Sequence, residues 1–382
     1  MSRSLLSQKS IIQLYTEPQL ATSVSLRQWE SLILVMRSEQ LLARFGYRFR
    51  DVGVLATLEK CVQRHFENAI TLAEHQHTQI RYEAEKLSTY LKGKTKKLVF
   101  LKGGAYVLSN CSASIGRTCG DVDVIVEKSD ITAVEKALIL AGWYHKDIND
   151  YDDQYYRKWA HEIPPLTHGV RGTVLDLHHN LVPIISGRMV DTEILFRYTK
   201  THSHGIETLT EPAMFVHSSI HLFFNEDFKY AYRDFFDLYL LSKGKSSEFW
   251  IEVINISKAL NFKSEVERAI RYLSLCFELK LPSETISLFD KKLFVFELSF
   301  KDKVFISGLS PKHYLSTDFF GIISAWLLML RGHFLKMPLP ILFYHLTVKS
   351  VRAILESVLG KHIFTKVENS KSIQNNLTSK RD

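Results

Sequence analysis

The spacing of apolar residues changes along the chain and divides it into helical and mixed parts. From about residue 25 to 91, apolar residues recur at steps of three and four, which is typical of amphipathic helices. The same spacing returns at 210–242 and 248–281. Between residues 97 and 183 short apolar runs alternate with helical spacing, which indicates a core of strands and helices.

Within this core, strand and helix patterns follow one another. LVFL is predicted to be a buried strand that ends at two glycines, and AYVLSNC a short helix. DVDVIV is predicted to be a second strand, and ITAVEKALILAGW an amphipathic helix that ends near Gly142. YYRKWAHEIPPLTH and TVLDLHHNLV are predicted to be two more strands, joined by VRGT, where Gly172 supplies a left-handed turn residue.

These patterns predict the domain organisation. We place an N-terminal helical region at 1–95, a central α/β core at 96–205 and a C-terminal helical domain at 206–360. Residues 361–382 are basic and polar, and we expect them to form a disordered tail.

The most informative pattern is the Asp-x-Asp of GDVDVIV. A period of two places Asp121 and Asp123 on one face of the strand and the valines on the other. The apolar flanks indicate that the segment enters a core, where two carboxylates are costly unless a cation neutralises them. Oxygen ligands at this spacing suit Mg²⁺ that also holds substrate phosphates. The pattern therefore predicts phosphoryl or nucleotidyl transfer, although a lone Asp-x-Asp is more often a solvated pair.

A third carboxylate follows in LDLHHNL. Strand alternation sets Asp176, His178 and Asn180 on one face. A strand placed beside DVDVIV would bring Asp176 next to Asp121 and Asp123, completing three acidic ligands around a pair of Mg²⁺ ions. The alternative is that Asp176 accepts a hydrogen bond from a neighbour. The sequence assigns no role to His178.

Two basic residues flank the glycines and the acids. Arg117 would suit bidentate contact with a phosphate, and Lys102 would act as a point charge. Each would equally pair with an acidic ligand and steady the site without a nucleotide. Since nucleotidyl transfer depends mostly on positioning and charge stabilisation, Asp176 is also the candidate that helps to take the acceptor proton.

These motifs resemble the uncharacterised nucleotidyltransferases of the DNA polymerase beta-like superfamily. The resemblance rests on LKGGA at 101–105, on R-x-x-x-D-V-D-V-I-V at 117–126, and on HEIPPL followed by LDLHHNL. It extends more weakly to WESLILVMRSEQLLARF, to RDFFDLYLL and to LPILFYHLTVKSVRAIL.

The resemblance implies an α+β fold, in which a small mixed sheet, the nucleotidyltransferase core, is flanked by helices and has helical regions at both ends. It also implies an NTP donor bound through Mg²⁺ or Mn²⁺ and transfer of a nucleotidyl group to an acceptor. Gly103 and Gly104 would form the close-approach turn beside the phosphates, and the metal ligands would be Asp121, Asp123 and Asp176. The chain departs from the superfamily in two ways: the spacer between Gly104 and Asp121 is long, and Gly-Gly replaces the usual Gly-Ser.

The net charge limits the classes of partner that the chain favours, and the cysteine spacing limits the kinds of site that it can form. A net charge of +8 and a pI near 9.1 favour polyanions such as nucleotides, nucleic acid or an anionic membrane. Nucleic-acid binding is not favoured, because the basic clusters lack interleaved aromatic residues. The four cysteines form no C-x-x-C pair, which argues against a zinc ribbon or disulfide framework. With no secretory signal pattern at the N-terminus, we expect a cytoplasmic location.

One apolar segment, residues 319–346, raises the question of a membrane. Its uninterrupted apolar stretch ends at Arg331, short of the roughly 20 residues that a spanning helix requires. We therefore predict a buried core helix and no transmembrane segment. Because basic residues follow and Pro338 and Pro340 break the chain, peripheral membrane contact is the alternative.

Two rival functions remain open from the sequence. A nucleotide-sugar glycosyltransferase also uses Asp-x-Asp to bind a divalent ion, although the upstream glycines and the third aspartate argue against it. A nucleotide-binding interaction module without catalysis would not need three acids. The HSSIH segment at 217–221 lacks the glutamate of a metalloprotease, so packing is the better interpretation there. The acceptor is not identified, and the role of Arg233 is limited to a guess that it braces the cleft.

Overall fold

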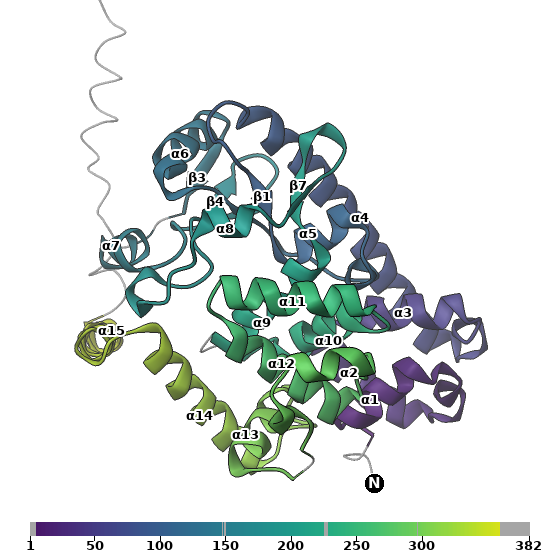
Figure 1. The fold of residues 1–382 in the computed structure, drawn as a ribbon. Helices are drawn as coiled ribbons and strands as arrows, with labels where there is room; N and C mark the ends of the chain where they lie inside the picture. The colour runs from purple at the N-terminus through teal and green to yellow at the C-terminus, as the bar shows by residue number, and fades with distance from the viewer. Residues whose placement is uncertain (1–4, 147, 149, 225–227, 296, 360–382) are drawn as a thin grey trace, which may run out of the picture.

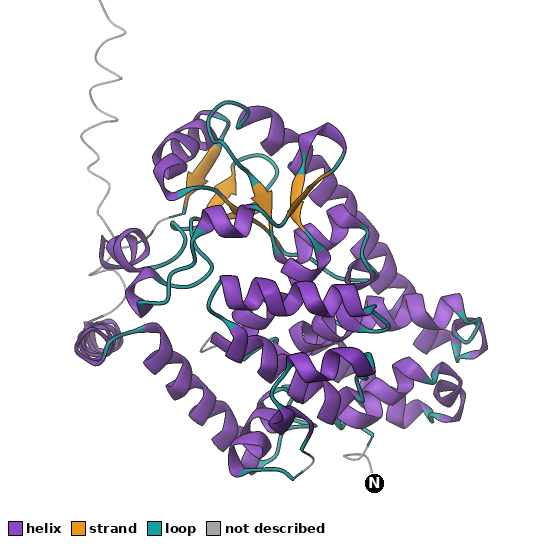
Figure 2. Ribbon diagram, in the orientation of Figure 1, coloured by secondary structure: helices purple, strands orange, loops and turns teal. Residues whose placement is uncertain are grey.

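The computed structural model describes residues 5–146, 148, 150–224, 228–295 and 297–359. A mixed sheet lies at the top of the view in Figure 1, with α4 along its right side and α9 to α12 stacked beneath it. Figure 2 shows that helices cover the sheet and make up the rest of the molecule. This arrangement confirms the predicted α+β fold with flanking helices.

The sheet has seven strands in the order β3-β4-β5-β2-β1-β7-β6. Strand β2 lies between β1, its antiparallel neighbour, and β5, its parallel neighbour. The strands are β1 Val99–Phe100, β2 Asp121–Ile125, β3 Trp143–His145, β4 Leu166–His168, β5 Val174–His178, β6 Thr199–Thr201 and β7 Glu207–Leu209. The sheet thus extends to Leu209, just past residue 205, where we placed the end of the core.

The helices fall into three groups along the chain. The N-terminal group is α1 Gln8–Thr16, α2 Leu26–Ser38, α3 Leu42–Asp51 and α4 Lys60–Tyr90. The core contains α5 Lys102–Ser109, α6 Ile131–Leu140, α7 Asp150–Trp159 and α8 Thr192–Phe196. The C-terminal group is α9 Glu211–Phe224, α10 Ala231–Ser242, α11 Ser247–Ala259, α12 Lys263–Phe277, α13 Phe300–Gly308, α14 Phe319–Lys336 and α15 Leu339–Leu359.

Aromatic packing holds the C-terminal helices together. The ring of Phe277 at the end of α12 lies 4.7 Å from Phe235 and 5.3 Å from Tyr239, both on α10. Helix α9 is apolar almost all round and is buried along its length, because α10, α11 and α12 all pack against it. Helices α9 to α12 thus form a helical block that faces the sheet.

The segment at 155–168 differs from its prediction. Its first part is the end of α7, and only Leu166–His168 forms a strand, β4. The sequence DYDDQYYRKW lacks the alternation of a strand, and Asp153 pairs with Arg157 one helical turn later at 3.0 Å. Pro164 and Pro165 then keep the helix from continuing into β4. The predicted turn at Gly172 is confirmed, since its φ is +68° in the connection between β4 and β5.

The apolar segment at 319–346 also differs from its prediction. Helix α14 turns small residues such as Gly321 and Ser324 inward, while Phe319 and Trp326 are 76% and 61% exposed. The expectation of a buried core helix is therefore wrong. By length and composition α14 is the one described helix that could cross a membrane, which is weak evidence because core helices of soluble proteins pass the same test. The tail predicted at 361–382 lies outside the described residues.

Gly116 offers a test of how the loop before β2 packs. Its φ is +64°, and an added Cβ would lie 2.5 Å from backbone atoms of Arg44 on α3. Gly116→Ala should lower the free energy of unfolding by about 3 kcal/mol or more, because backbone strain and a backbone clash add. The matched control is Gly244→Ala, since Gly244 has φ +68° but open space around it, and should cost about 1–2 kcal/mol. If urea unfolding shows that both variants lose the same free energy of unfolding, the close packing of Gly116 against α3 would be contradicted.

Candidate active site

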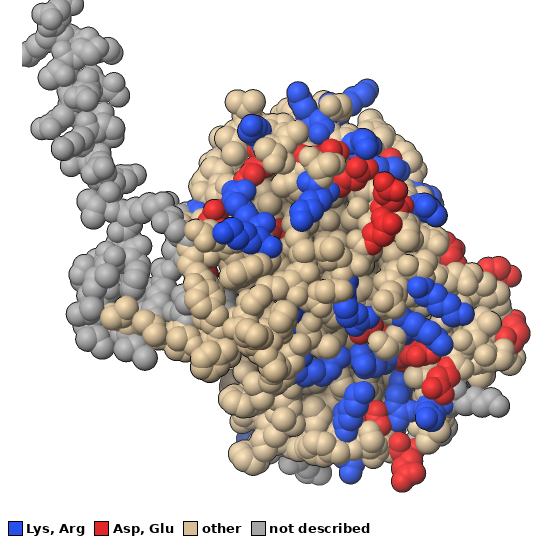
Figure 3. All heavy atoms as spheres, turned by 60° about the vertical axis from the view of Figure 1, so that its left-hand side comes forward, with Lys and Arg blue, Asp and Glu red and all other residues tan. Residues whose placement is uncertain are grey.

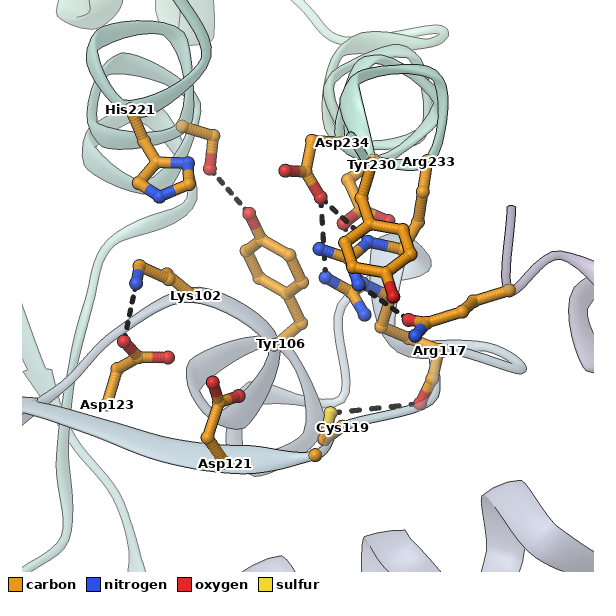
Figure 4. Close-up of a pocket in the computed structure, with 15 residues that line it drawn as sticks. Lys102, Tyr106, Arg117, Cys119, Asp121, Asp123, His221, Tyr230, Arg233 and Asp234 are labelled. Carbon is orange, nitrogen blue, oxygen red and sulfur yellow. Dashed lines mark hydrogen bonds and ion pairs between the residues drawn. The ribbon is translucent and has the colours of Figure 1, made fainter. Parts of the chain in front are cut away.

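A cavity of about 390 Å³ lies between the sheet and the helical block. Strand β2 and helix α5 form one wall, and α9 and α10 form the other. Figure 4 shows Asp121 and Asp123 below the cavity, His221 above them on α9, and Arg233 with Asp234 on the far side. The residues that line the cavity are Gln40, Lys102, Gly103, Tyr106, Arg117, Cys119, Gly120, Asp121, Asp123, Ser218, His221, Tyr230, Arg233, Asp234 and Asp237.

The glycine motif forms the first turn of α5. The residue with a left-handed backbone is Lys102, at φ +47°, where β1 passes into the helix. A Cβ on Gly103 would lie 2.9 Å from Cys119 Sγ, so this glycine lets α5 approach the segment that precedes Asp121. An added Cβ on Gly104 would meet Ile80 at 4.0 Å, which is an ordinary contact. The close approach shown by the structure is thus between two protein segments.

Asp123 is buried and has two cationic partners. Its Oδ1 accepts a hydrogen bond from Lys102 Nζ at 2.5 Å and from His178 Nε2 at 3.0 Å. Burial alone would raise its pKa, but the charge of Lys102 and the hydrogen bond from His178 outweigh burial and hold the pKa well below its usual range. Asp123 is therefore ionised at neutral pH.

Asp176 lies beside Asp123 because their strands are parallel neighbours. The two residues are paired in the register of β2 and β5. Oδ1 of Asp176 is buried without a hydrogen-bond partner among the described residues. Burial, followed by the charges of Asp123 and Glu162, raises the pKa of Asp176 to about 7. Lys102 and His178 thus neutralise only part of the negative charge of Asp123, Asp176 and Glu162.

Asp121 is the most open of the three predicted ligands. Its residue is exposed at the start of β2 and lines the cavity. Burial of its carboxyl group and the charge of Asp123 still raise its pKa. The structure therefore brings the three aspartates to one region, with Asp121 at the cavity and Asp176 beside Asp123.

Arg117, a predicted phosphate contact, is engaged with the helical block. It is buried, its Nε donates to Asp237 Oδ2 at 2.7 Å, and its Nη2 lies 3.5 Å from Asp234 Oδ1. Asp237 also accepts from Arg44 Nη2 at 2.7 Å. One buried carboxylate thus joins α3, α10 and the loop before β2, and Arg117 acts as a brace between the two walls.

Arg233, on α10, brings a second guanidinium group to the cavity. Its Nε donates to Asp234 at 2.8 Å, its Nη1 donates to Gln40 at 2.6 Å, and the group lies over the ring of Tyr230 at 4.7 Å. The guess that Arg233 braces the cleft agrees with these contacts, and the residue also lines the cavity.

Sequence reasoning missed two contributors to the site. His221, from the dismissed HSSIH segment, lines the cavity, and burial followed by the charge of Lys102 lowers its pKa well below the usual value. Glu162, from HEIPPL, forms an isolated β-bridge with His178, and its Oε2 lies 3.2 Å from His178 Nδ1. A signal for Glu162 was present in HEIPPL, whereas tertiary packing alone places His221.

Residues 25–278 match the model of an uncharacterised nucleotidyltransferase family. The chain belongs to this family. The match spans all seven strands and helices α2 to α12, so every residue of the site lies within it. No curated protein matches the chain.

Asp176 should make the stability of this nucleotidyltransferase family member depend on pH. The folded protein holds the Asp176 proton more tightly than the unfolded chain, whose aspartates have pKa values of about 3.9. The contribution of Asp176 to the free energy of unfolding of the wild type is therefore complete below pH 4. It is lost as the pH rises toward 7. In EDTA, Asp176→Asn should be more stable than wild type at pH 8 by about 1–3 kcal/mol, and equal at pH 4.

The control for this titration is Asp130→Asn. A hydrogen bond from the Lys96 amide is the main cause that lowers the pKa of Asp130, so its removal should slightly lower stability at pH 8. Urea unfolding at both pH values measures each variant against wild type. A loss of stability in Asp176→Asn at pH 8 would show that its carboxylate is already well compensated.

Proposed function

We propose that this protein is a divalent-metal-dependent nucleotidyltransferase that moves a nucleoside monophosphate from an NTP to a hydroxyl group of an acceptor. The observation that carries the proposal is the register of β2 and β5, which sets Asp176 beside Asp123 with a buried carboxylate oxygen that lacks a partner among the described residues. Membership of the family supports the same reaction class.

The donor set suits a hard divalent cation. Asp121, Asp123 and Asp176 offer carboxylate oxygens, which Mg²⁺ and Mn²⁺ favour as ligands. The raised pKa of Asp176 indicates that Lys102 and His178 do not fully compensate the acids around it. Mg²⁺ or Mn²⁺ held by these three aspartates would supply positive charge to the triphosphate and to the acceptor oxygen.

The remaining residues then take separate roles. Lys102 is partly exposed beside the carboxylates and can reach a phosphate as a point charge. Arg233 and the ring of Tyr230 lie on the opposite wall and can contact phosphate or stack on a flat base. Asp176 lies beside Asp123 and is the candidate that accepts the proton of the acceptor hydroxyl. Arg117 keeps the two walls at a fixed spacing through Asp237.

The rival functions are less well supported. The family match argues against a nucleotide-sugar glycosyltransferase. A buried acid with a raised pKa lowers the stability of the fold, which argues against a binding module that has no use for it.

The donor can be found before the acceptor is known. A thermal-shift screen of the four NTPs with Mg²⁺ or Mn²⁺ should give a metal-dependent rise in melting temperature for the true donor, because a ligand of the native state stabilises it. The donor labelled at its α-phosphate then reports transfer.

With this assay, Asp121→Asn and Asp123→Asn should each reduce transfer by about 1000-fold, since each removes a charge that holds the cation. Asparagine keeps a partner for Lys102, so folding should remain near normal. The matched control is Asp153→Asn, which removes a surface acid on α7 and should keep full activity. Sugar transfer from a nucleotide sugar without label transfer, or full activity in both aspartate variants, would refute the proposal.

A further inference from the structure

A second group of donor atoms adjoins the aspartates and is not used by the reaction proposed above. It consists of His161, Glu162 and His178, whose ligand atoms all lie within 4.8 Å of one another. His161 and Glu162 come from HEIPPL, which meets the end of β5 through the β-bridge between Glu162 and His178. Backbone pairing therefore holds these two neighbouring segments of the chain together.

His178 has a carboxylate near each of its two ring nitrogens. Its Nε2 lies 3.0 Å from Asp123 Oδ1, and its Nδ1 lies 3.2 Å from Glu162 Oε2. A neutral imidazole that donates Nε2–H to Asp123 directs the lone pair of Nδ1 at the lone pairs of Glu162. That pairing is repulsive unless a proton or a metal ion lies close to both atoms.

The spacing fits a shared metal ion. Nitrogen and oxygen ligands at about 2.0–2.2 Å in a tetrahedral arrangement lie about 3.3–3.5 Å apart, close to the separation of these two atoms. His161 supplies the third donor. Its ring centroid lies 5.3 Å from that of His178, and its Nδ1 is buried without a hydrogen-bond partner in the described parts of the chain.

We propose that His161, Glu162 and His178 bind one borderline transition-metal ion of the Zn²⁺ class, at a site distinct from the three aspartates. Two imidazole nitrogens and one carboxylate favour Zn²⁺ or Co²⁺ over Mg²⁺, which prefers oxygen ligands. His178 then links the two sites. Its Nε2–H bond to Asp123 follows the common pattern in which a metal-bound histidine donates its other N–H to a carboxylate. His178 is thus a positioning residue for Asp123.

Metal titration tests the site without any nucleotide. Full-length protein stripped with EDTA and desalted should bind one equivalent of Co²⁺, with the visible absorption of a tetrahedral ion, in the presence of millimolar Mg²⁺. His161→Ala and Glu162→Gln should each weaken Co²⁺ and Zn²⁺ binding at least about 100-fold. The matched controls are His75→Ala, an exposed histidine on α4, and Asp121→Asn; both should bind as wild type.

The outcomes separate this site from the proposed reaction. Binding that survives His161→Ala but disappears in Asp121→Asn would place the metal at the aspartates and overturn the proposal. Absence of stoichiometric binding would show that a proton, and not a metal, joins His178 to Glu162. Co²⁺ binding in a protein that transfers no nucleotide would support this site and refute the transferase proposal alone.

A separate observation concerns the outer face of α14 and α15, which we call the apolar face. On α14 it includes Phe319, Ile322 and Trp326, which are 60–76% exposed. On α15 it includes Leu339 and Phe343, at 65% and 76% exposed. The side of the molecule that carries these helices is turned forward in Figure 3, where a broad area has few charged side chains. Apolar surface of this extent usually marks an interaction site.

The charge of the same part of the chain indicates the partner. Residues 319–382 contain nine Lys and Arg against three Asp and Glu, which is six of the eight net positive charges of the chain. Five of the nine lie at 361–381, directly after the end of α15. Apolar side chains joined to a basic segment match an anionic bilayer, which accepts the former at its interface and attracts the latter.

We propose that the apolar face docks on an anionic phospholipid surface, with α14 and α15 lying along the interface. The arrangement does not depend on the reaction at the aspartates.

Liposome sedimentation tests this docking. The full chain should pellet with vesicles of phosphatidylserine and phosphatidylcholine, pellet less at 0.5 M salt, and stay soluble with phosphatidylcholine alone. A double variant, Trp326→Ser with Phe343→Ser, should reduce binding at least about 10-fold. Leu72→Ser, which alters an exposed leucine on α4, is the matched control and should bind normally. Failure to pellet with anionic vesicles, or a dimer in solution that the double variant dissociates, would overturn the proposal.

Discussion

The site depends on one constraint, the crowding of like charges where β2 and β5 pair in parallel. Parallel pairing in this register sets Asp123 directly beside Asp176, and Glu162 adds a third carboxylate through its bridge to β5. Lys102 and His178 compensate Asp123, which accepts hydrogen bonds from both. Burial, followed by the charges of Asp123 and Glu162, raises the pKa of Asp176 to about 7. A protein that needed stability alone would place apolar residues here.

The buried ion pairs around Asp237 serve a different purpose. They link α3, α10 and the loop before β2, so that the helical block stands at a set distance from the sheet. Removing one partner would leave buried charge uncompensated, at a cost of about 3–5 kcal/mol. Gly116 contributes to the same junction, because the absence of a side chain lets the loop approach the α3 backbone. The width of the cavity is thus fixed by contacts outside the set of aspartates.

Local patterns predicted much of this architecture, and long-range contacts account for what they missed. Alternation in DVDVIV and LDLHHNL predicted β2 and β5, because polar and apolar residues take turns along each strand. The strand assigned at 155–168 was wrong because Tyr and Trp suit strands and helices alike, and the Asp153–Arg157 pair favours the helix. The exposure of α14 was not predicted, because an apolar composition does not indicate which side of a helix packs against the rest of the protein. The partner of Arg117 is 120 residues away, beyond the reach of any spacing rule.

Lys102 combines two features in one residue. Its backbone has the left-handed conformation at the turn from β1 into α5, which costs a residue with a side chain about 1–3 kcal/mol, and its ammonium group holds Asp123. Glycine would relieve that strain but would remove the ammonium group. When a substrate or cation takes over the charge of Asp123, the electrostatic tether on this turn weakens while the strain remains. The turn that begins α5, the helix that carries Tyr106 along the cavity wall, is therefore held by the same ion pair with which a bound cation would compete.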